Sequence, residues 1–137
     1  MFDPWQELNA RPEVTLEWRF LPAEFYALTD GLSRIWMDPH QSQTERRCTI
    51  AHELAHIDLG HLNGCTSGEE SAASQLAARR LIPLGRLADA LLWSQDHGAI
   101  SDALWVDIST LRARLDHLRP SEQHYIRGVL ARREDGA

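Results

Sequence analysis

Lysine is missing from this sequence, and all 14 of its basic residues are arginines. We attribute this bias to a GC-rich coding genome and infer nothing structural from it. Cysteine is also scarce, since Cys48 and Cys65 are the only two. A disulfide-rich secreted scaffold is therefore excluded, and both thiols are expected to be free in a reducing compartment, with Cys48 as a small core residue.

Long hydrophobic runs are absent as well. No stretch of about 18 or more apolar residues occurs, so no transmembrane helix is expected. The sequence begins Met1-Phe2-Asp3-Pro4-Trp5, without the basic and apolar regions of a signal peptide, which predicts a cytoplasmic protein with no membrane partner.

Length and composition indicate one soluble globular unit. The chain has 137 residues, of which 43% are hydrophobic and 25% are charged. Its formal net charge is −6. Because nucleic-acid binders usually carry a basic surface, this charge argues against a general nucleic-acid binder.

The N-terminal part predicts a small antiparallel sheet over about residues 14–37. Residues 14–20 alternate apolar and polar side chains as a half-buried strand does, with Val14, Leu16, Trp18 and Phe20 on one face. A weaker apolar stretch at 24–28 is followed by Asp30-Gly31, a strong hairpin signal. Residues 32–37 then form a second clear strand.

The remaining chain predicts helices. The first spans about 41–60, with Thr44 as a possible N-cap and Gly60 as its C-cap. The second begins at Ser67 or Gly68 and ends at Pro83; its small residues favour close packing on the first. Further helices are expected at 84–95, 99–105, 109–118 and 121–133, with Asp107 or Ser109 capping the third of these and Ser121 the fourth. We divide the chain into a core over 1–83 and a C-terminal helical subdomain over 84–137.

The helix over 41–60 contains the pattern H-E-x-x-H, formed by His52, Glu53 and His56. Residues four apart lie on the same helix face, so the two imidazoles can bind one Zn²⁺ at about 2.0–2.1 Å. Glu53 lies beside the first ligand and is free to accept a proton from a zinc-bound water. The competing interpretation is a surface helix with two solvated histidines, because three fixed positions also occur by chance.

A catalytic zinc needs a third protein ligand. The pattern H-E-x-x-H-x-x-G-x-x-H is not present, because Gly60 and His61 are each displaced by one position from it. A carboxylate from the next helix is the other source. Glu70 fits, since it shares a helix face with the small residues that follow it, and Glu69 is the alternative. Cys65 is a weaker alternative ligand.

At these residues the chain resembles the ImmA/IrrE family of metallo-endopeptidases. The first signature runs from Arg47 to His56 and continues to Gly60-His61. The second is a helix of the form E-x-x-A-x-x-F-A-x-x-L-L-x-P, whose matching positions here are Glu70, Ala73, Leu76, Ala77, Leu81 and Pro83. Two positions depart from this form: Leu76 stands where Phe is usual, and Arg80 stands where Leu is usual. Neither position is a ligand, so both departures concern packing more than chemistry. The resemblance covers about residues 32–118.

The resemblance implies an α+β, gluzincin-like fold, in which the sheet packs on the H-E-x-x-H helix and on the Glu-bearing helix. It implies zinc ligands at His52, His56 and Glu70, with Glu53 as general base. The short chain is similar to phage and mobile-element members, which act on a helix-turn-helix repressor of their own element. The expected activity is therefore zinc-dependent hydrolysis of a peptide bond in such a repressor.

Several roles stay open at this stage. His61 is either a group that supports the site or a histidine favoured by the helix C-terminus, and the second is slightly preferred. Candidates for stabilising the oxyanion are His97, His124, Tyr26 and Tyr125. The strand over 32–37 is expected to pair with an extended substrate.

The main alternative is a regulator that binds DNA or a repressor without cutting it. Residues 100–115 resemble a helix-turn-helix, and Arg112, Arg114 and Arg119 could meet phosphates. Acidic neighbours and the negative net charge favour instead a helical subdomain that packs on the catalytic part. A pseudo-enzyme is the least favoured, because the H-E-x-x-H pattern and Glu70 are intact.

Overall fold

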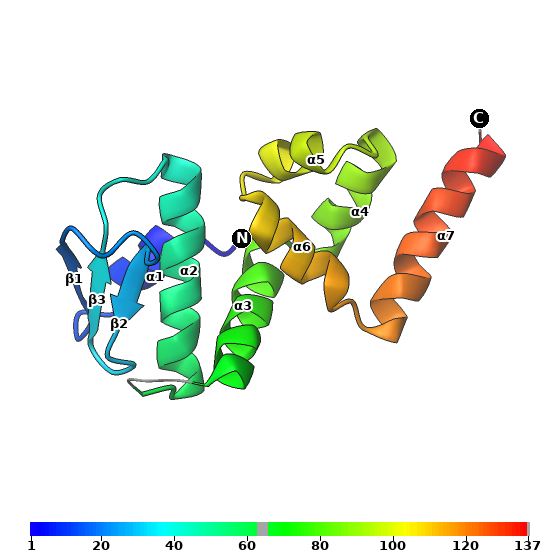
Figure 1. Ribbon diagram of the computed structural model, residues 1–137. Helices are drawn as coiled ribbons and strands as arrows, with labels where there is room; N and C mark the ends of the chain where they lie inside the picture. Colours follow the sequence, from blue (N-terminus) through cyan, green and yellow to red (C-terminus); the bar gives the residue numbers. More distant parts are fainter. Residues whose placement is uncertain (63–65, 137) are drawn as a thin grey trace.

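The structure, a computed structural model, describes residues 1–62 and 66–136 (Figure 1). Cys65, the weaker of the expected zinc ligands, lies outside the described residues. The elements in chain order are α1 (Pro4–Asn9), β1 (Thr15–Trp18), β2 (Ala27–Thr29), β3 (Arg34–Met37), α2 (Gln43–Leu59), α3 (Ser67–Leu81), α4 (Leu84–Trp93), α5 (His97–Leu104), α6 (Ile108–Asp116) and α7 (Pro120–Gly136).

The layers follow the chain. The sheet lies on one side of α2, α3 packs on the other side, and α7 lies farthest from the sheet (Figure 1). The α+β class predicted from the sequence is confirmed. In residues 1–62 and 66–136, every helix is too short or too polar to cross a lipid bilayer.

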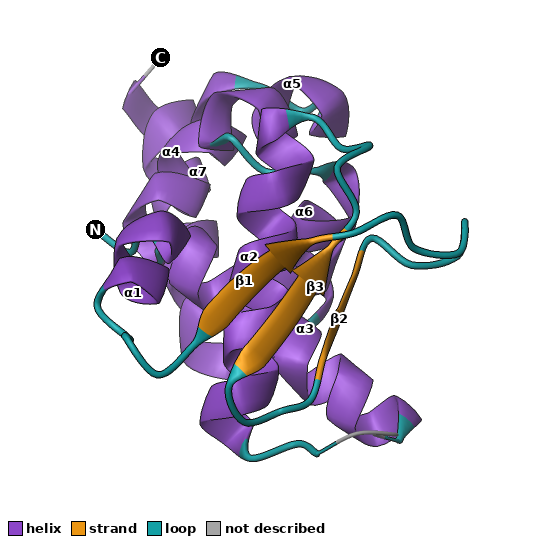
Figure 2. Cartoon of the chain, turned by 90° about the vertical axis from the view of Figure 1, so that its left-hand side faces the viewer, coloured by secondary structure: helices purple, strands orange, loops and turns teal. Residues whose placement is uncertain are grey.

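The sheet is mixed rather than antiparallel, which corrects the sequence-based expectation. Its strand order is β1-β3-β2, with β1 parallel to β3 and β2 antiparallel to β3 (Figure 2). Trp18 at the end of β1 and Ala27 at the start of β2 both lie opposite Met37. The connection between them therefore crosses the end of β3, a span of about two strand spacings of 4.8 Å. Alternation along a strand gives no information on such a crossing.

One face of the sheet packs on α2. Ile35 and Met37 of β3 are completely buried, and they share a hydrophobic cluster with Ile50 and Leu54 of α2. The expected apolar face of residues 14–20 is correct only at its start: Val14 is buried, whereas Trp18 is 48% exposed and Phe20 75% exposed. Phe20 lies in the connection after β1, where the alternation no longer has a sheet to face.

The start of α2 is fixed by a capping box. The Ser42 hydroxyl accepts a hydrogen bond from the Glu45 backbone N–H (3.1 Å), and the Glu45 carboxylate accepts one from the Ser42 N–H (2.9 Å). The expected cap, Thr44, is therefore wrong by one half-turn. The end is as expected: Gly60 adopts the left-handed conformation, φ 74°, which only glycine adopts without strain.

Small side chains allow α2 and α3 to approach closely. Ala51 and Ala55 of α2 and Ala73 and Ala77 of α3 are buried in one cluster. Arg80 Nη1 of α3 also lies 2.7 Å from the Asp58 carboxylate of α2, so an ion pair joins the same two helices. Leu59 is 44% exposed, because it lies in the last turn of the helix.

The C-terminal helices share the core with α2 and α3. The cluster that contains the four alanines continues through Leu87 of α4, Ile100 of α5, Leu111 of α6 and Ile126 of α7. Asp107 caps α6, as one of the two expected residues, by accepting from the Thr110 N–H at 2.8 Å. The division at residue 83 stays a prediction.

The segment α5-turn-α6 has the outline of a helix-turn-helix, but one of its key arginines points inward. Arg114 is 3% exposed and donates to the Ile82 carbonyl (2.9 Å) and to the Glu122 carboxylate (2.6 Å). Arg114 is therefore not accessible to a phosphate. Arg112 and Arg119 are exposed.

Glu122 joins three helices and leads to a prediction about acid stability. It accepts from Arg114 and, at 2.9 Å, from Arg79 of α3; the hydrogen bond from Arg114 is the main reason that its pKa falls to about 2 from an ordinary 4.5. Because the folded-state pKa is lowered, the stabilisation is present above pH 4.5 and is lost as the pH falls toward 2.

We expect Glu122→Gln to destabilise the protein by about 3 kcal/mol at neutral pH, since the buried Arg114 charge loses its partner. The variant should also lose part of the wild-type decrease in stability between pH 4.5 and 2. Urea unfolding at several pH values measures both effects. Parallel wild-type and variant curves across that range would show that Glu122 does not titrate as described.

Candidate metal centre

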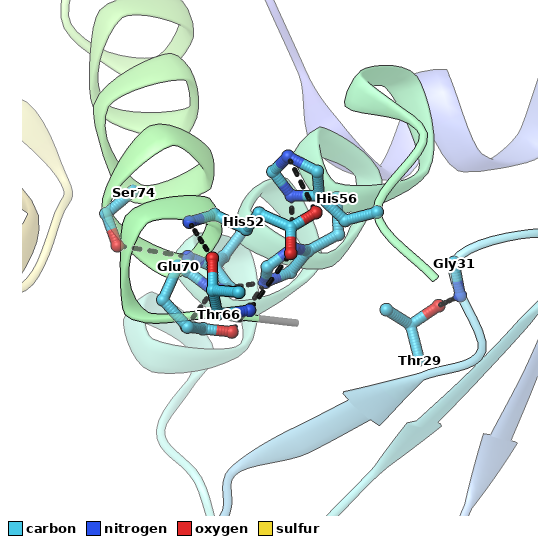
Figure 3. Close-up of polar contacts among 9 residues, drawn as sticks. Thr29, Gly31, His52, His56, Thr66, Glu70 and Ser74 are labelled. Atoms are coloured by element: carbon cyan, nitrogen blue, oxygen red, sulfur yellow. Dashed lines mark hydrogen bonds and ion pairs between the residues drawn. The ribbon is translucent and has the colours of Figure 1, made fainter. Parts of the chain in front are cut away.

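Two imidazoles and one carboxylate from successive helices meet at one point. His52 and His56 come from α2 and Glu70 from α3 (Figure 3). The two Nε2 atoms are 3.1 Å apart, Glu70 Oε2 is 3.1 Å from His52 Nε2, and Glu70 Oε1 is 2.8 Å from His56 Nε2. One donor atom of each residue lies within 4.8 Å of the others.

These separations fit a small tetrahedral cation. Ligand bonds of about 2.0–2.1 Å place neighbouring donors of a tetrahedral zinc about 3.3 Å apart. The observed contacts of 2.8–3.1 Å are slightly shorter than this edge, so a cation needs only a small outward movement of the three donors. Two neutral imidazoles and a carboxylate also form a donor set that zinc prefers.

Glu69, the alternative third ligand, is occupied elsewhere. Its carboxylate accepts from the Thr66 N–H at 3.0 Å and completes the capping box of α3. Its other oxygen lies 3.7 Å from His61 Nε2. Adjacent helical residues point about 100° apart, and Glu69 does not belong to the cluster of three donors. The geometry favours Glu70 over Glu69 as the third ligand.

Both histidines are supported through their second nitrogen. His52 Nδ1 is 3.4 Å from the Ser74 hydroxyl on α3 (Figure 3), and His56 Nδ1 is 3.0 Å from His61 Nδ1. A metal-binding histidine is commonly held by such a contact, which fixes its orientation and its tautomer. The interpretation slightly preferred from the sequence, a histidine favoured by the helix C-terminus, does not describe this contact: the centroids of the His61 and His56 rings are 5.2 Å apart.

The electrostatics suit metal binding at His52. Burial lowers the pKa of His52, more than the neighbouring Glu70 carboxylate raises it. The imidazole is therefore neutral at physiological pH, the form in which a ring nitrogen can bind a metal.

Glu53 is a buried carboxyl group at the edge of the same site. It is 6% exposed and lines the cleft described next. Burial, followed by repulsion from Glu70, raises its pKa to about 8. A carboxyl group with a raised pKa is suited to accept a proton near neutral pH, and a nearby cation would favour its charged form.

The three donors lie in the wall of a cleft of about 910 Å³. Its walls come from β2 with the residues before it, from α2 and α3, and from the start of α6. Cys48 also lines it; as expected this residue is buried, and burial raises the pKa of its thiol. The participation of α6 in the cleft was not visible in the sequence, because nothing in the pattern of residues 107–113 indicates which element it faces.

Of the four candidate oxyanion donors, Tyr26 lines the cleft. Its hydroxyl donates a hydrogen bond to the Glu45 carboxylate, which raises the pKa of Tyr26. His97, His124 and Tyr125 are exposed and, in the described part of the chain, do not belong to the cleft lining. These three candidates are therefore not supported as parts of the site.

The edge of the sheet at the cleft is β2, not the strand over 32–37. β3 has a neighbour on both sides and cannot accept a further strand. Within residues 1–62 and 66–136, β2 pairs with β3 on one side only, and Ala27, Leu28 and Thr29 line the cleft. The expectation that residues 32–37 pair with substrate is therefore wrong, because the chain order of the strands is not their order in the sheet.

A helix with two histidines four residues apart, completed by a carboxylate from the next helix, is the donor set of a His₂Glu metallopeptidase site. The family model of the IrrE N-terminal-like domain, peptidase family M78, matches residues 23–116. The chain belongs to this family, which supports the resemblance seen in the sequence. No curated protein and no solved structure matches the chain. The matched range ends with α6 and leaves α7 outside.

The geometry predicts a ranking of two neighbouring carboxylates. Glu70→Ala should weaken zinc binding much more than Glu69→Ala, because Glu70 faces both imidazoles. The effect of Glu69→Ala should be limited to about tenfold, the lower range for residues outside the ligand set. Competition with a chromogenic chelator measures both affinities. The opposite ranking would assign the third ligand to Glu69.

Proposed function

We propose that this protein is a zinc-dependent endopeptidase, with His52, His56 and Glu70 as zinc ligands and Glu53 as general base. One observation carries the proposal: three suitable donors converge in the wall of a cleft that is also lined by β2, a strand that pairs only with β3 among the described residues. Membership of a peptidase family supports the same function.

Each protein group has a defined task in peptide hydrolysis. The two imidazoles and the Glu70 carboxylate would hold the cation, which when bound would polarise the scissile carbonyl and make a water molecule more acidic. The Glu53 carboxylate accepts the proton of the attacking water and passes it to the leaving amine. Because Glu53 is almost fully buried, this transfer takes place away from bulk water.

The cleft suits an extended peptide. A segment added to the free edge of β2 would hydrogen-bond to the backbone of residues 27–29 and pass the metal centre. Phe25, Tyr26, Leu28 and Leu62 line the cleft with exposed apolar surface that can receive substrate side chains. Four carboxylates and, in the described residues, no arginine line the cleft, which favours a neutral or basic segment.

A helix-turn-helix repressor of the same phage or mobile element is the substrate that we favour. This choice comes from the resemblance to the ImmA/IrrE family. The alternative, a DNA-binding regulator, is weakened because Arg114 is buried and because α6 forms part of the cleft wall. The net charge of −6 also disfavours DNA as the ligand.

Incubation with the repressor encoded beside this gene tests the proposal. We expect cleavage at one site, its loss on treatment with a chelator, and its return when zinc is restored. Cleavage that persists after complete removal of metal would contradict the metal-dependent mechanism, and an intact repressor in all conditions would remove this substrate.

Glu53→Gln separates metal binding from proton transfer. The substitution keeps the size of the side chain, so fold and zinc affinity should be retained. Cleavage should fall by about 10²–10⁴-fold, because the amide cannot accept the proton. Product formation measured by mass spectrometry, with zinc content as the control, gives both quantities. Full proteolysis by this variant would refute the assignment of Glu53.

A further inference from the structure

We infer that His61, with the Glu69 carboxylate beside it, forms an outer chain that holds His56 in the tautomer required for metal binding, through a hydrogen bond from His56 to His61 and a charge interaction between His61 and Glu69. The inference rests on the proposed metal centre but not on the choice of substrate. His61 is here a positioning residue: it acts through His56 and does not reach the three-donor cluster.

His61 reaches this place because α2 ends in a reversal. Gly60 takes the left-handed conformation, and the His61 backbone N–H donates to the His56 carbonyl at 2.9 Å. This C-terminal motif folds the chain back over the last turn of the helix. The His61 side chain is consequently only 11% exposed.

The turn between β2 and β3 supports the same position. Gly31 has φ 77°, and a Cβ at Gly31 would come within 1.7 Å of the His61 carbonyl oxygen. Such a contact is impossible without movement of the backbone at His61. The turn between β2 and β3 therefore lies directly against the segment that carries His61. This segment is held by the end of α2 on one side and by the turn on the other.

The contact between the His56 and His61 rings determines which nitrogen of each ring carries the proton. His56 Nε2 faces His52 and Glu70, so a metal at that nitrogen leaves the proton of the neutral ring on Nδ1. His56 Nδ1 lies 3.0 Å from His61 Nδ1. A hydrogen bond between two Nδ1 atoms requires that His61 Nδ1 carries no proton and accepts.

The proton of a neutral His61 is then on Nε2, and that atom faces a carboxylate. Glu69 Oε2 lies 3.7 Å from His61 Nε2, which is longer than a hydrogen bond but within the range of a favourable charge interaction. Glu69 therefore favours the tautomer of His61 that accepts from His56. A metal-binding histidine is ordinarily supported by a carboxylate or a carbonyl that accepts its second N–H. Here a second histidine, His61, lies between the metal-binding His56 and the Glu69 carboxylate.

Two substitutions of His61 separate its hydrogen-bonding role from a packing role. His61→Phe keeps a flat ring but has no acceptor, whereas His61→Asn loses the ring and keeps an oxygen near the position of Nδ1. We expect His61→Phe to weaken zinc binding by about 10–100-fold and His61→Asn to retain more of the affinity. A purely structural role for the ring would produce the reverse order.

The zinc dissociation constant, measured by chelator competition on the full-length protein, is the readout, and thermal melting without metal checks the fold. Glu69→Gln provides an independent variant, because glutamine preserves the capping box of α3 but not the negative charge beside His61. It should weaken zinc binding by a smaller factor than His61→Phe. The exposed His124 provides the matched control: His124→Phe should not change the affinity.

The outcomes distinguish this inference from the metal centre on which it rests. Wild-type affinity in His61→Phe, or equal losses in His61→Phe and His61→Asn, overturns the inference. His52→Ala, measured in the same way, tests the centre itself. If His52→Ala also binds zinc normally, the proposed centre is wrong. If His52→Ala loses zinc and the His61 variants do not, the proposed centre is supported and the role of the outer chain is refuted.

Discussion

The close contact between α2 and α3 determines whether a metal centre can form. The two histidines lie on one helix and the carboxylate on the other, so the distance between the donors depends on how closely the two helices pack. Four alanines at the contact allow a short distance, and an added side-chain volume there would cost about 1–3 kcal/mol or push the helices apart. The Asp58–Arg80 ion pair joins the same two helices, and a capping box determines the residue at which each of them begins. The site is therefore a product of helix packing.

The surrounding elements then give the centre its chemical surroundings. The sheet contributes the outer edge of β2 to the cleft, and the turn at Gly31 lies in close contact with the segment that carries His61. The start of α6 closes another wall. Glu53 stays buried among these elements, and burial raises the pKa of its carboxyl group. A cation bound by His52, His56 and Glu70 would lie beside a proton acceptor that bulk water barely reaches.

The sequence predicted the parts of the fold and the site that depend on local spacing. H-E-x-x-H, the following Glu70 and the helix end at Gly60 are all short-range patterns, and the structure brings these groups together as expected. Ser42 and Thr66 were missed as caps, although each begins an S/T-x-x-E pattern that predicts a capping box. Strand order, the inward direction of Arg114 and the contact between His56 and His61 depend on packing between distant segments. Such contacts leave no periodic signal in one sequence.

The ligand set of the bound metal is the central claim, and X-ray absorption at the zinc edge tests it most directly. The loaded protein should show four light-atom neighbours at about 2.0–2.2 Å, with the outer-shell scattering of two imidazoles and no sulfur. A sulfur neighbour at about 2.3 Å, or a shell of oxygens without imidazole scattering, would contradict the centre formed by His52, His56 and Glu70.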